Sequence, residues 1–508
     1  MNYNQYNISI FNHSIYLMKI KHLFCLLLLT AFASCNEKLS LENENEYENE
    51  ASLTPVTRAP GDAQYDVLGF GYDITGDYLN PMSVRNLVID IERYHRDRPG
   101  RVKIGTASSG SDKFFYGADS ADYLEEITKD YTISVSGGYD NGNNSNNSNN
   151  ENSKQLFSGS ISTNHFLKSK GEYSSKYSFA SRDVVRSIKR LWISEDAEYM
   201  TDYLTPEFLE DVNRLSPTRL VERYGTHVLT DITIGGRYRL LFRSIIDKTT
   251  NRTEIKSIVK AGAEASWKGI NGKAEGAVTN ETVTNLVNEN RHKELFVTFY
   301  GGKGSCIKYD LEEGKPTSSD IAEWENTVSL NNANLTDVNW KETIPLYRFI
   351  KDPQKKEAVK KAIEDDIEEH SIKMIEVEPF YCYYSAKYVN HSYFTEWQGY
   401  HFNTDDYMGI TCYLPSKNEP GAVPLYEYYS AKYVNHSYFT EYRGKHFNTD
   451  DYQGIAGYIF KEKKDGTVPL YAYYSAKYVN HSYFAEDKGR QFNTDERIGI
   501  LGYVYPAD

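Results

Sequence analysis

Apolar and polar residues alternate over two long segments of the chain, which is the pattern of a β-strand with two different faces. In the first segment, residues 126–180, the runs "YTISVSGGY" and "LFSGSISTNHF" flank the Asn/Ser-rich residues 141–153. A low-complexity polar stretch without core-forming residues predicts a loop. We therefore expect a long β-hairpin with residues 141–153 at its tip.

The second alternating segment is residues 255–280. Odd positions from Val259 to Trp267 are Val, Ala, Ala, Ala and Trp, whereas the even positions between 260 and 268 are Lys, Gly, Glu, Ser and Lys. The phase of the alternation changes after Ile270. This period of two indicates strands with small residues on one face. The neighbouring runs "RYRLLFRSII" and "ELFVTFYGG" predict buried strands.

Helical spacing appears in three other places. "DVVRSIKRLWIS" (183–194) and "TPEFLEDVNRL" (205–215) have apolar residues at the spacing of a helix, with Thr205 as the predicted N-cap. Asp352-Pro353 opens a third helix. We expect it to close the large domain with an apolar face, listed here in full: Ala358, Val359, Ala362, Ile363 and Ile367. A solvated linker helix is the alternative.

The C-terminal residues 378–508 contain an internal repeat. The stretch "YYSAKYVNHSYF" begins at 383, 428 and 473, and each copy continues into "FNTD" and a strand ending in tyrosine. A period of 45 residues fits a WD40 blade in length, but the Trp-Asp signature is missing and three copies are too few. We predict an all-β pseudo-threefold domain, of trefoil or prism type.

Of the 44 tyrosines, 23 lie in these repeats. Rings at equivalent positions can form a core, or they can form a sugar-binding surface beside Asn and His side chains. The candidates for receptor or glycan binding are Tyr388, Asn390, His391, Tyr393, Tyr433, Asn435, His436, Tyr438, Tyr478, Asn480, His481 and Tyr483. A metal site is not expected, because His401 and His446 give way to Gln491 in the third copy.

Composition and the N-terminus suggest where the protein works. The formal net charge of −14 argues against nucleic acid as a partner. From Met18, a basic and then apolar stretch ends at Cys35, and it resembles a bacterial lipoprotein signal (1–35) with Cys35 as the lipidated residue. The acidic residues 36–61 form a predicted disordered tether, similar to the export tether of Bacteroidetes surface lipoproteins. An ordinary signal peptide and a plain linker are the alternatives.

Cysteine usage adds little chemistry. None of the five cysteines has zinc-ligand spacing. Cys382 and Cys412 are interpreted as free thiols or as one optional bridge.

"YGTHVLTDITIGG" (224–236) places a polar cluster before two glycines. Acid–base catalysis by His227 would need a neighbouring carboxylate, and Asp211, Glu222 and Asp231 are near in sequence. Nucleophile-elbow, H-E-x-x-H and Walker-type motifs are missing. We therefore expect neither an enzyme nor a cofactor.

Tyr224, Gly225, Thr226 and His227, followed by Gly235 and Gly236, match the signature of the membrane attack complex/perforin (MACPF) family, except that Val228 replaces Phe or Tyr. "LGFGYDITG" (68–76) also resembles the start of that family's domain. The resemblance implies an α+β MACPF domain over 62–377, like that of cholesterol-dependent cytolysins: a bent antiparallel sheet, flanked by helical clusters that unfurl into membrane hairpins. Residues 126–180 and 246–292 lie in the corresponding places, and Gly235 and Gly236 would lie at the bend.

The expected function is that of a perforin-like pore-forming protein, and an antibacterial toxin is one candidate role. It would bind a surface glycan or protein receptor, self-associate into a ring and insert strands into the target membrane. The expected location is the bacterial outer membrane, with the chain lipid-anchored and surface-exposed or released. The alternative is a non-lytic adhesin or glycan-binding lipoprotein with the same fold.

Overall fold

A computed structural model describes residues 64–507, apart from 77, 108–109, 132–173, 250, 271–280, 304–306, 311–320 and 371–373. Residues Thr54–Asp508 form one compact unit. The predicted leader, the acidic tether and the loop at 141–153 lie outside the described residues, as does most of the first predicted hairpin.

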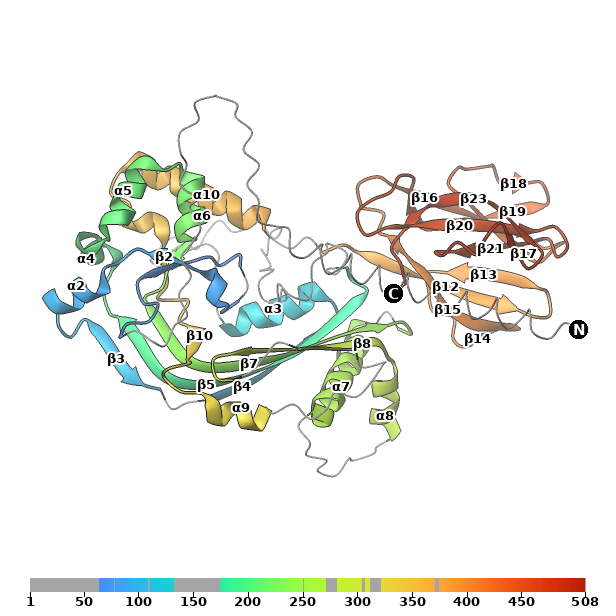
Figure 1. The fold of residues 1–508 in the computed structure, drawn as a ribbon. Coiled ribbons are helices and arrows are strands. Elements are labelled where there is room, and N and C mark those ends of the chain that lie inside the picture. The colour runs from blue at the N-terminus through green and yellow to red at the C-terminus, as the bar shows by residue number, and fades with distance from the viewer. Residues whose placement is uncertain are drawn as a thin grey trace, which may run out of the picture. The chain divides into compact units, whose positions relative to one another are not determined.

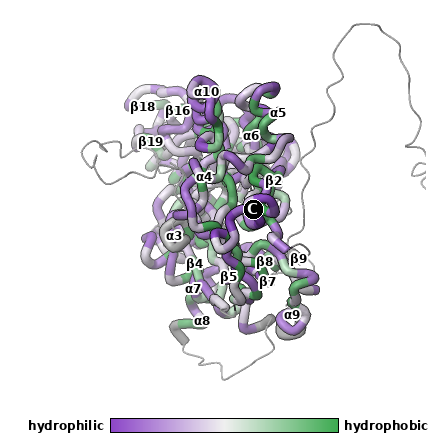
Figure 2. Tube along the Cα trace, turned by 90° about the vertical axis from the view of Figure 1, so that its left-hand side faces the viewer, coloured by the Kyte–Doolittle hydropathy of each residue, from purple (hydrophilic) through white to green (hydrophobic). Residues whose placement is uncertain are grey.

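The first folded region is built on an antiparallel sheet of seven strands (Figure 1). The path of the sheet runs through five strands: β3 (Val102–Thr106), β5 (Tyr177–Ile193), β7 (Asp231–Ile246), β8 (Asn290–Tyr300) and β9 (Ile307–Asp310). In addition, β4 (Gly110–Gly117) pairs with β5, and β10 (Asn334–Val338) pairs with β7. The predicted strands at β7 and β8 are confirmed, and Figure 2 shows apolar positions in both.

A second, small antiparallel sheet lies beside the helices of this region. Its order is β11 (Ile344–Pro345), β6 (His227–Val228), β1 (Phe70–Tyr72) and β2 (Val84–Leu87). The surrounding helices are α2 (Ile91–Asp97), α4 (Ala197–Met200), α5 (Pro206–Arg214), α6 (Pro217–Tyr224) and α10 (Pro353–Glu369). The predicted caps hold, because Thr205 accepts a hydrogen bond from Phe208 N–H and Asp352 accepts one from Lys355 N–H.

Helix α10 packs on the protein core rather than linking domains through solvent. Val359, Ile363 and Ile367 are buried in the same core as Leu220 of α6. Ala358, which was predicted on that face, is exposed.

One predicted helix is wrong. Residues 183–193 belong to β5, which pairs with β7 on one side and with β3 and β4 on the other. β-Branched residues such as Val184 and Val185 favour a pleated strand. The long pairing with β7 outweighs the helical spacing that the sequence suggested.

The second alternating segment is also helical in this structure. Residues Arg252–Ile270 form α7 and Glu281–Asn288 form α8. Alanine is the best helix former, and the buried Val259, Ala263 and Trp267 are four residues apart, on one helical face. A spacing of four satisfies both a period of two and a helix, which explains the difference from the prediction.

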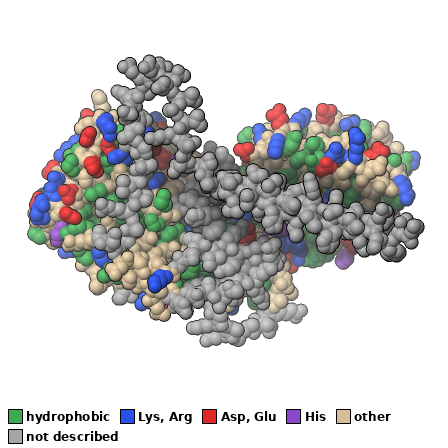
Figure 3. Space-filling view, viewed as in Figure 1, with side chains coloured by type: hydrophobic (Ala, Val, Ile, Leu, Met, Phe, Trp, Pro, Cys, Tyr) green, Lys and Arg blue, Asp and Glu red, His purple; other side chains and the backbone are tan. Residues whose placement is uncertain are grey.

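The repeats form three similar lobes, each a four-stranded antiparallel unit. The first contains β12 (Val377–Ser385), β13 (Asn390–Phe394), β14 (His401–Phe402) and β15 (Asp405–Pro415). The second contains β16 (Ala422–Ser430), β17 (Asn435–Phe439), β18 (His446–Phe447) and β19 (Asp450–Phe460). The third contains β20 (Val468–Ser475), β21 (Asn480–Phe484), β22 (Gln491–Phe492) and β23 (Asp495–Val504). Figure 3 shows acidic and basic side chains interspersed on the visible face of these lobes.

Candidate functional site

Two glycines bring the end of α6 into backbone contact with β1. Gly225 follows α6 with a φ of 74°, in the left-handed region. A Cβ on Gly225 would lie 2.5 Å from the carbonyl oxygen of Tyr72, and a Cβ on Gly71 would lie 1.8 Å from the carbonyl oxygen of Tyr224. Only glycine permits such an approach. The signature and the "LGFGYDITG" segment are therefore two halves of one contact.

Thr226 ties three chain segments together at this point. Its main-chain N–H donates to the Tyr72 carbonyl at 2.9 Å, and its hydroxyl accepts from Ile74 N–H at 3.2 Å. Its own carbonyl accepts from Leu346 N–H at 2.9 Å. The bonded residues are all buried, so Thr226 fixes β1 on one side of the signature and Leu346, the residue after β11, on the other.

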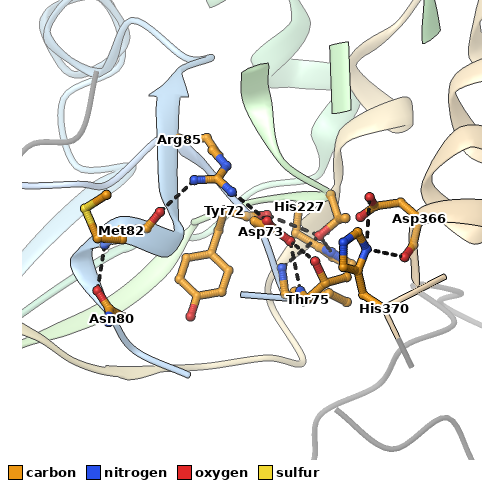
Figure 4. Close-up of polar contacts among 11 residues, drawn as sticks. Tyr72, Asp73, Thr75, Asn80, Met82, Arg85, His227, Asp366 and His370 are labelled. Atoms are coloured by element: carbon orange, nitrogen blue, oxygen red, sulfur yellow. Dashed lines mark hydrogen bonds and ion pairs between the residues drawn. The ribbon is translucent and has the colours of Figure 1, made fainter. Parts of the chain in front are cut away.

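His227 is a buried, neutral side chain (Figure 4). Burial lowers its pKa to about 4, although the nearby Asp73 carboxylate acts in the opposite direction. The Nδ1 atom lies 3.0 Å from Thr226 Oγ1. Asp73 itself is paired with Arg85 at 2.7 Å.

The three carboxylates considered as partners of His227 are engaged elsewhere. Asp231 pairs with Arg190 at 2.6 Å. Asp211 accepts from Tyr224 Oη at 2.8 Å, and Glu222 pairs with Arg219 at 2.7 Å. The geometry assigns His227 to the packing of β6, between β1 and β11.

Gly235 and Gly236 lie where β7 changes its partner. Along one edge, β7 pairs with β10 up to Gly235 and with β8 from Arg237 onward. Along the other edge, the register with β5 shifts between Ser187 and Lys189, next to the glycine pair. A Cβ on Gly235 would lie 1.9 Å from the Arg186 carbonyl oxygen, so no side chain fits at this position.

Two helical segments cover opposite faces of this sheet. Leu241 of β7 packs in one cluster with Tyr123 and Ile127 of α3 (Ser120–Tyr131). Leu240 and Phe242 pack in another cluster, with α7. Successive residues of a strand point to opposite faces, so α3 and α7 lie on different sides of β7.

A buried charge cluster beneath α3 was not anticipated. Arg237 and Arg239 of β7 both contact Asp183 of β5, at 3.0 and 3.2 Å, and Arg239 also donates to Tyr123 Oη at 2.7 Å. The signal in the sequence was the pair of arginines that opens the apolar run "RYRLLFRSII". The cluster links α3 to two strands of the sheet.

The twelve candidates in the repeats separate by exposure. Tyr393, Tyr438 and Tyr483 are buried and contact one another, and Asn390, Asn435 and Asn480 are also buried. The histidines His391, His436 and His481 are partly buried. Tyr388, Tyr433 and Tyr478 expose 39–42% of their surface. A ligand approaching the lobes would meet this last series first.

The two cysteines of the repeats, Cys382 and Cys412, are buried free thiols. Within the part of the chain that the structure describes, no group of His, Cys, Asp or Glu side chains could hold a metal ion. Among the same residues, no helix combines the length and apolarity needed to cross a bilayer.

The bent antiparallel sheet with flanking helices defines a fold of the MACPF and cholesterol-dependent cytolysin class. Residues 57–375 match the family model of the MAC/perforin domain, which is more than half of the chain. The protein therefore belongs to the MAC/perforin family. No curated protein matches the chain.

Two solved structures are similar to this chain. One is described as a cell invasion protein with a MAC/perforin domain from Bacteroides thetaiotaomicron VPI-5482, with 16% identity, 68% of this chain and 69% of that chain covered, and a TM-score of 0.48. The other is GNIP1Aa from Chromobacterium piscinae, with 15% identity, 88% and 82% covered, and a TM-score of 0.47. At these values, neither supports an assignment of function.

Proposed function

We propose that this protein is a perforin-like pore former that binds a receptor through residues 378–508 and inserts hairpins from residues 62–377 into a target membrane. Its family and fold are related to pore-forming toxins and perforin-like proteins. The finer steps, which are receptor binding, ring assembly and lipid anchoring at Cys35, belong to the proposal.

The observation that carries the proposal is that α7 suits two conformations. As a helix, it buries Val259, Ala263 and Trp267 against the sheet. As a strand, it would place the same three residues on one face with Ala261 and Ala265, opposite Lys260, Gly262, Glu264, Ser266 and Lys268. A strand of a membrane barrel must have one lipid-facing and one water-facing side. The sequence of α7 therefore meets the requirement of the inserted state while it packs well before insertion.

The position of α7 and α3 also supports the proposal that these helices unfold into membrane hairpins. Both helices cover the paired strands β5, β7 and β8, and their unfolding would leave a continuous antiparallel sheet to extend. A closed barrel satisfies every backbone group within a bilayer.

Purified protein without residues 1–35, mixed with target cells or with liposomes made from their lipids, tests the proposal. Release of an entrapped dye together with rings in electron micrographs supports a pore former. Tight binding to glycans or cells without leakage would contradict it, and would favour the adhesin.

A further inference from the structure

The same exposed turn joins two strands in each of the three lobes. In the first lobe it comprises residues 386–389, Ala-Lys-Tyr-Val, and it is closed by the pairing of Ser385 with Asn390. Residues 431–434 and 476–479 repeat the turn in the other two lobes.

A lysine and a tyrosine lie together at the tip of every turn, and we call them the Lys–Tyr pairs: Lys387 and Tyr388, Lys432 and Tyr433, and Lys477 and Tyr478. The lysine Nζ lies 4.8, 4.8 and 4.7 Å from the centre of the tyrosine ring in the three lobes. All three lysines are exposed, and so are the three tyrosines. Among the residues that the structure describes, no carboxylate forms an ion pair with any of these lysines. Each pair therefore presents a cation and an aromatic ring to solvent.

The turn holds its pair in one conformation. Val389 has a φ of 52°, in the left-handed region that a β-branched residue rarely adopts, and the equivalent valines have values of 52° and 53°. Ser385 Oγ lies 3.1 Å from Thr404 Oγ1 in the neighbouring β14–β15 turn, and the other lobes repeat this contact at 3.1 and 3.0 Å. Strained backbone of this kind persists where the surroundings fix it, often at ligand sites.

Packing explains why most of the repeated stretch is identical, but it does not explain the pairs. Tyr383, Asn390 and Tyr393 are buried, as are their equivalents in the other two repeats. Other exposed positions differ between the repeats, as two series show: Tyr400, Lys445 and Arg490, and Met408, Gln453 and Ile498. An exposed pair that is identical in all three copies therefore indicates a role at the surface.

The three pairs lie at one end of the pseudo-threefold axis. Asn480 Oδ1 accepts from His391 N–H at 3.0 Å, and the same contact recurs between the second and third repeats at 2.9 Å. Two residues further along the strands, Tyr483 N–H donates to Tyr393 Oη at 2.8 Å, with equivalent bonds of 3.0 and 3.3 Å at the other junctions. Because β13, β17 and β21 meet from their first residues onward, the turns that directly precede these strands surround the same end.

The polar side chains that follow the turns are engaged inside the domain. His391 Nδ1 lies 3.1 Å from Asn480 Nδ2, and the second and third repeats share the same contact at 3.0 Å. His436 Nδ1 lies 2.7 Å from Glu427 Oε1 instead. A ligand at this end of the domain therefore meets the Lys–Tyr pairs first.

A free ammonium beside an exposed ring suits a ligand with an anionic group and an apolar face. A carboxylate accepts charge-assisted hydrogen bonds from lysine, and the C–H face of a pyranose packs on a tyrosine ring. An anionic bilayer fits less well, because Asp406, Asp451 and Glu496 expose carboxylates near the turns and the net charge of the chain is −14. An extended negative surface would be repelled, whereas a single carboxylate binds the lysine at short range.

We propose that each Lys–Tyr pair is a binding site for an acidic sugar, of the uronic or sialic acid class. The carboxylate of the sugar binds the lysine ammonium, and its apolar face packs on the tyrosine. Three such sites at one end of the domain bind a surface rich in acidic sugars through avidity. The inference rests on the proposed receptor-binding role of residues 378–508, and it assigns that role to the turns rather than to the histidines.

The test uses the full chain and three probes: methyl glucuronide, methyl sialoside and, as the neutral counterpart of the first, methyl glucoside. Binding is measured by saturation-transfer NMR. We expect the wild-type chain to bind the glucuronide about tenfold more tightly than the glucoside, because only the glucuronide has a carboxylate for the lysine.

The first variant changes the lysine of every pair: Lys387→Gln, Lys432→Gln and Lys477→Gln. It should bind the glucuronide as weakly as the glucoside. The control makes the same change of charge at three exposed lysines in the connections between the repeats: Lys417→Gln, Lys461→Gln and Lys463→Gln. The control should bind like the wild type.

The second variant changes the tyrosine of every pair: Tyr388→Ala, Tyr433→Ala and Tyr478→Ala. It should lose binding of all three glycosides, whereas phenylalanine at the same positions keeps the ring and should retain binding. Melting temperatures should stay at the wild-type value in both, because the side chains are exposed. On a surface carrying many glucuronide groups, Tyr388→Ala alone should weaken binding by about tenfold, since one of three contacts is lost.

Wild-type affinity for the glucuronide in the lysine variant would overturn the proposal, as would equal affinities of the wild type for glucuronide and glucoside. Binding to glycan-free liposomes containing phosphatidylglycerol, lost in the lysine variant, would assign the pairs to an anionic bilayer instead. Binding of the wild type to target cells but to neither acidic glycoside would overturn the acidic-sugar sites and leave the receptor-binding role standing. That role fails if the wild-type chain does not bind target cells.

Discussion

The guanidinium of Arg252, at the start of α7, lies 2.6 Å from the carboxylate of Asp119, which directly precedes α3. Lys256 of α7 adds a second contact, to Asp122 at 3.0 Å. These ion pairs therefore join two helices that lie on opposite faces of the sheet. Detachment of one helix from the sheet should destabilise the packing of the other.

Replacing both cations, in Arg252→Gln/Lys256→Gln, should loosen α3 and α7 together. We expect faster amide hydrogen exchange in residues 120–131 and 252–270, because the carboxylates of Asp119 and Asp122, whose side chains are only 3% and 15% exposed, would lose their cationic partners. Lys360→Gln/Lys361→Gln on α10 removes two ion pairs between exposed side chains of a single helix and is the control. Faster exchange in α7 alone would show that the two helices are not coupled.

A side chain at Gly235 should not be tolerated. In Gly235→Ala, the new methyl group would meet the carbonyl oxygen of Arg186, which is main chain and cannot move aside cheaply. We expect a loss of about 2–4 kcal/mol in the free energy of unfolding, measured by urea titration. Gly105→Ala is the control, since its nearest atom would be a side-chain carbon of Trp192 at 3.3 Å. Equal stability of the two variants would contradict a steric requirement for glycine at position 235.

Stability should fall in acid because of His227. Its pKa is about 4 in the folded protein and about 6.5 when unfolded, so between these values the unfolded state binds more protons. The associated stability is complete above pH 6.5 and decreases as the pH falls through 4, by about 3 kcal/mol in total. His227→Gln lacks this term, so the stability difference between wild type and variant should shrink from pH 7 to pH 4.5. A constant difference would contradict the buried neutral imidazole.

Removal of the hydroxyl group should destabilise the protein at a core tyrosine of the repeats and not at a surface tyrosine. Tyr438→Phe removes the hydroxyl that serves both the N–H and the carbonyl of Tyr393, and should cost about 2 kcal/mol. Tyr388→Phe changes an exposed ring and should cost less than about 0.5 kcal/mol. The melting temperatures of the two variants test this expectation. Equal values would contradict the role of the Tyr438 hydroxyl in the hydrogen bonds among Tyr393, Tyr438 and Tyr483.

The sequence predicted those elements whose local pattern agrees with their tertiary role. β7 and β8 contain apolar runs, α5 and α10 have helical periods and N-caps, and all four form as expected. Residues 183–193 were misassigned, because helical spacing of Val184 and Ile188 says nothing about the distant β7 that pairs with them. The repeats were evident, but the buried places of Tyr393 and Asn390 depend on how the lobes meet. Glu427 is the one charged residue at a position where the other two repeats have Cys382 and Ala472, so the sequence already marks it as unusual. Only the structure shows what that carboxylate contacts.

The central claim is that α7 changes from a helix on the sheet to a membrane strand. Its most direct test places an environment-sensitive fluorophore at single cysteines, one at a time, at the α7 positions 260, 261, 264, 265 and 266, which are not buried in the folded protein, in a chain whose native cysteines are replaced by alanine. On liposomes made from target-cell lipids, we predict that labels at 261 and 265 move into an apolar environment. Labels at 260, 264 and 266 should stay in water, because a strand alternates. No change on membranes, or a change with helical rather than twofold period, would contradict the account.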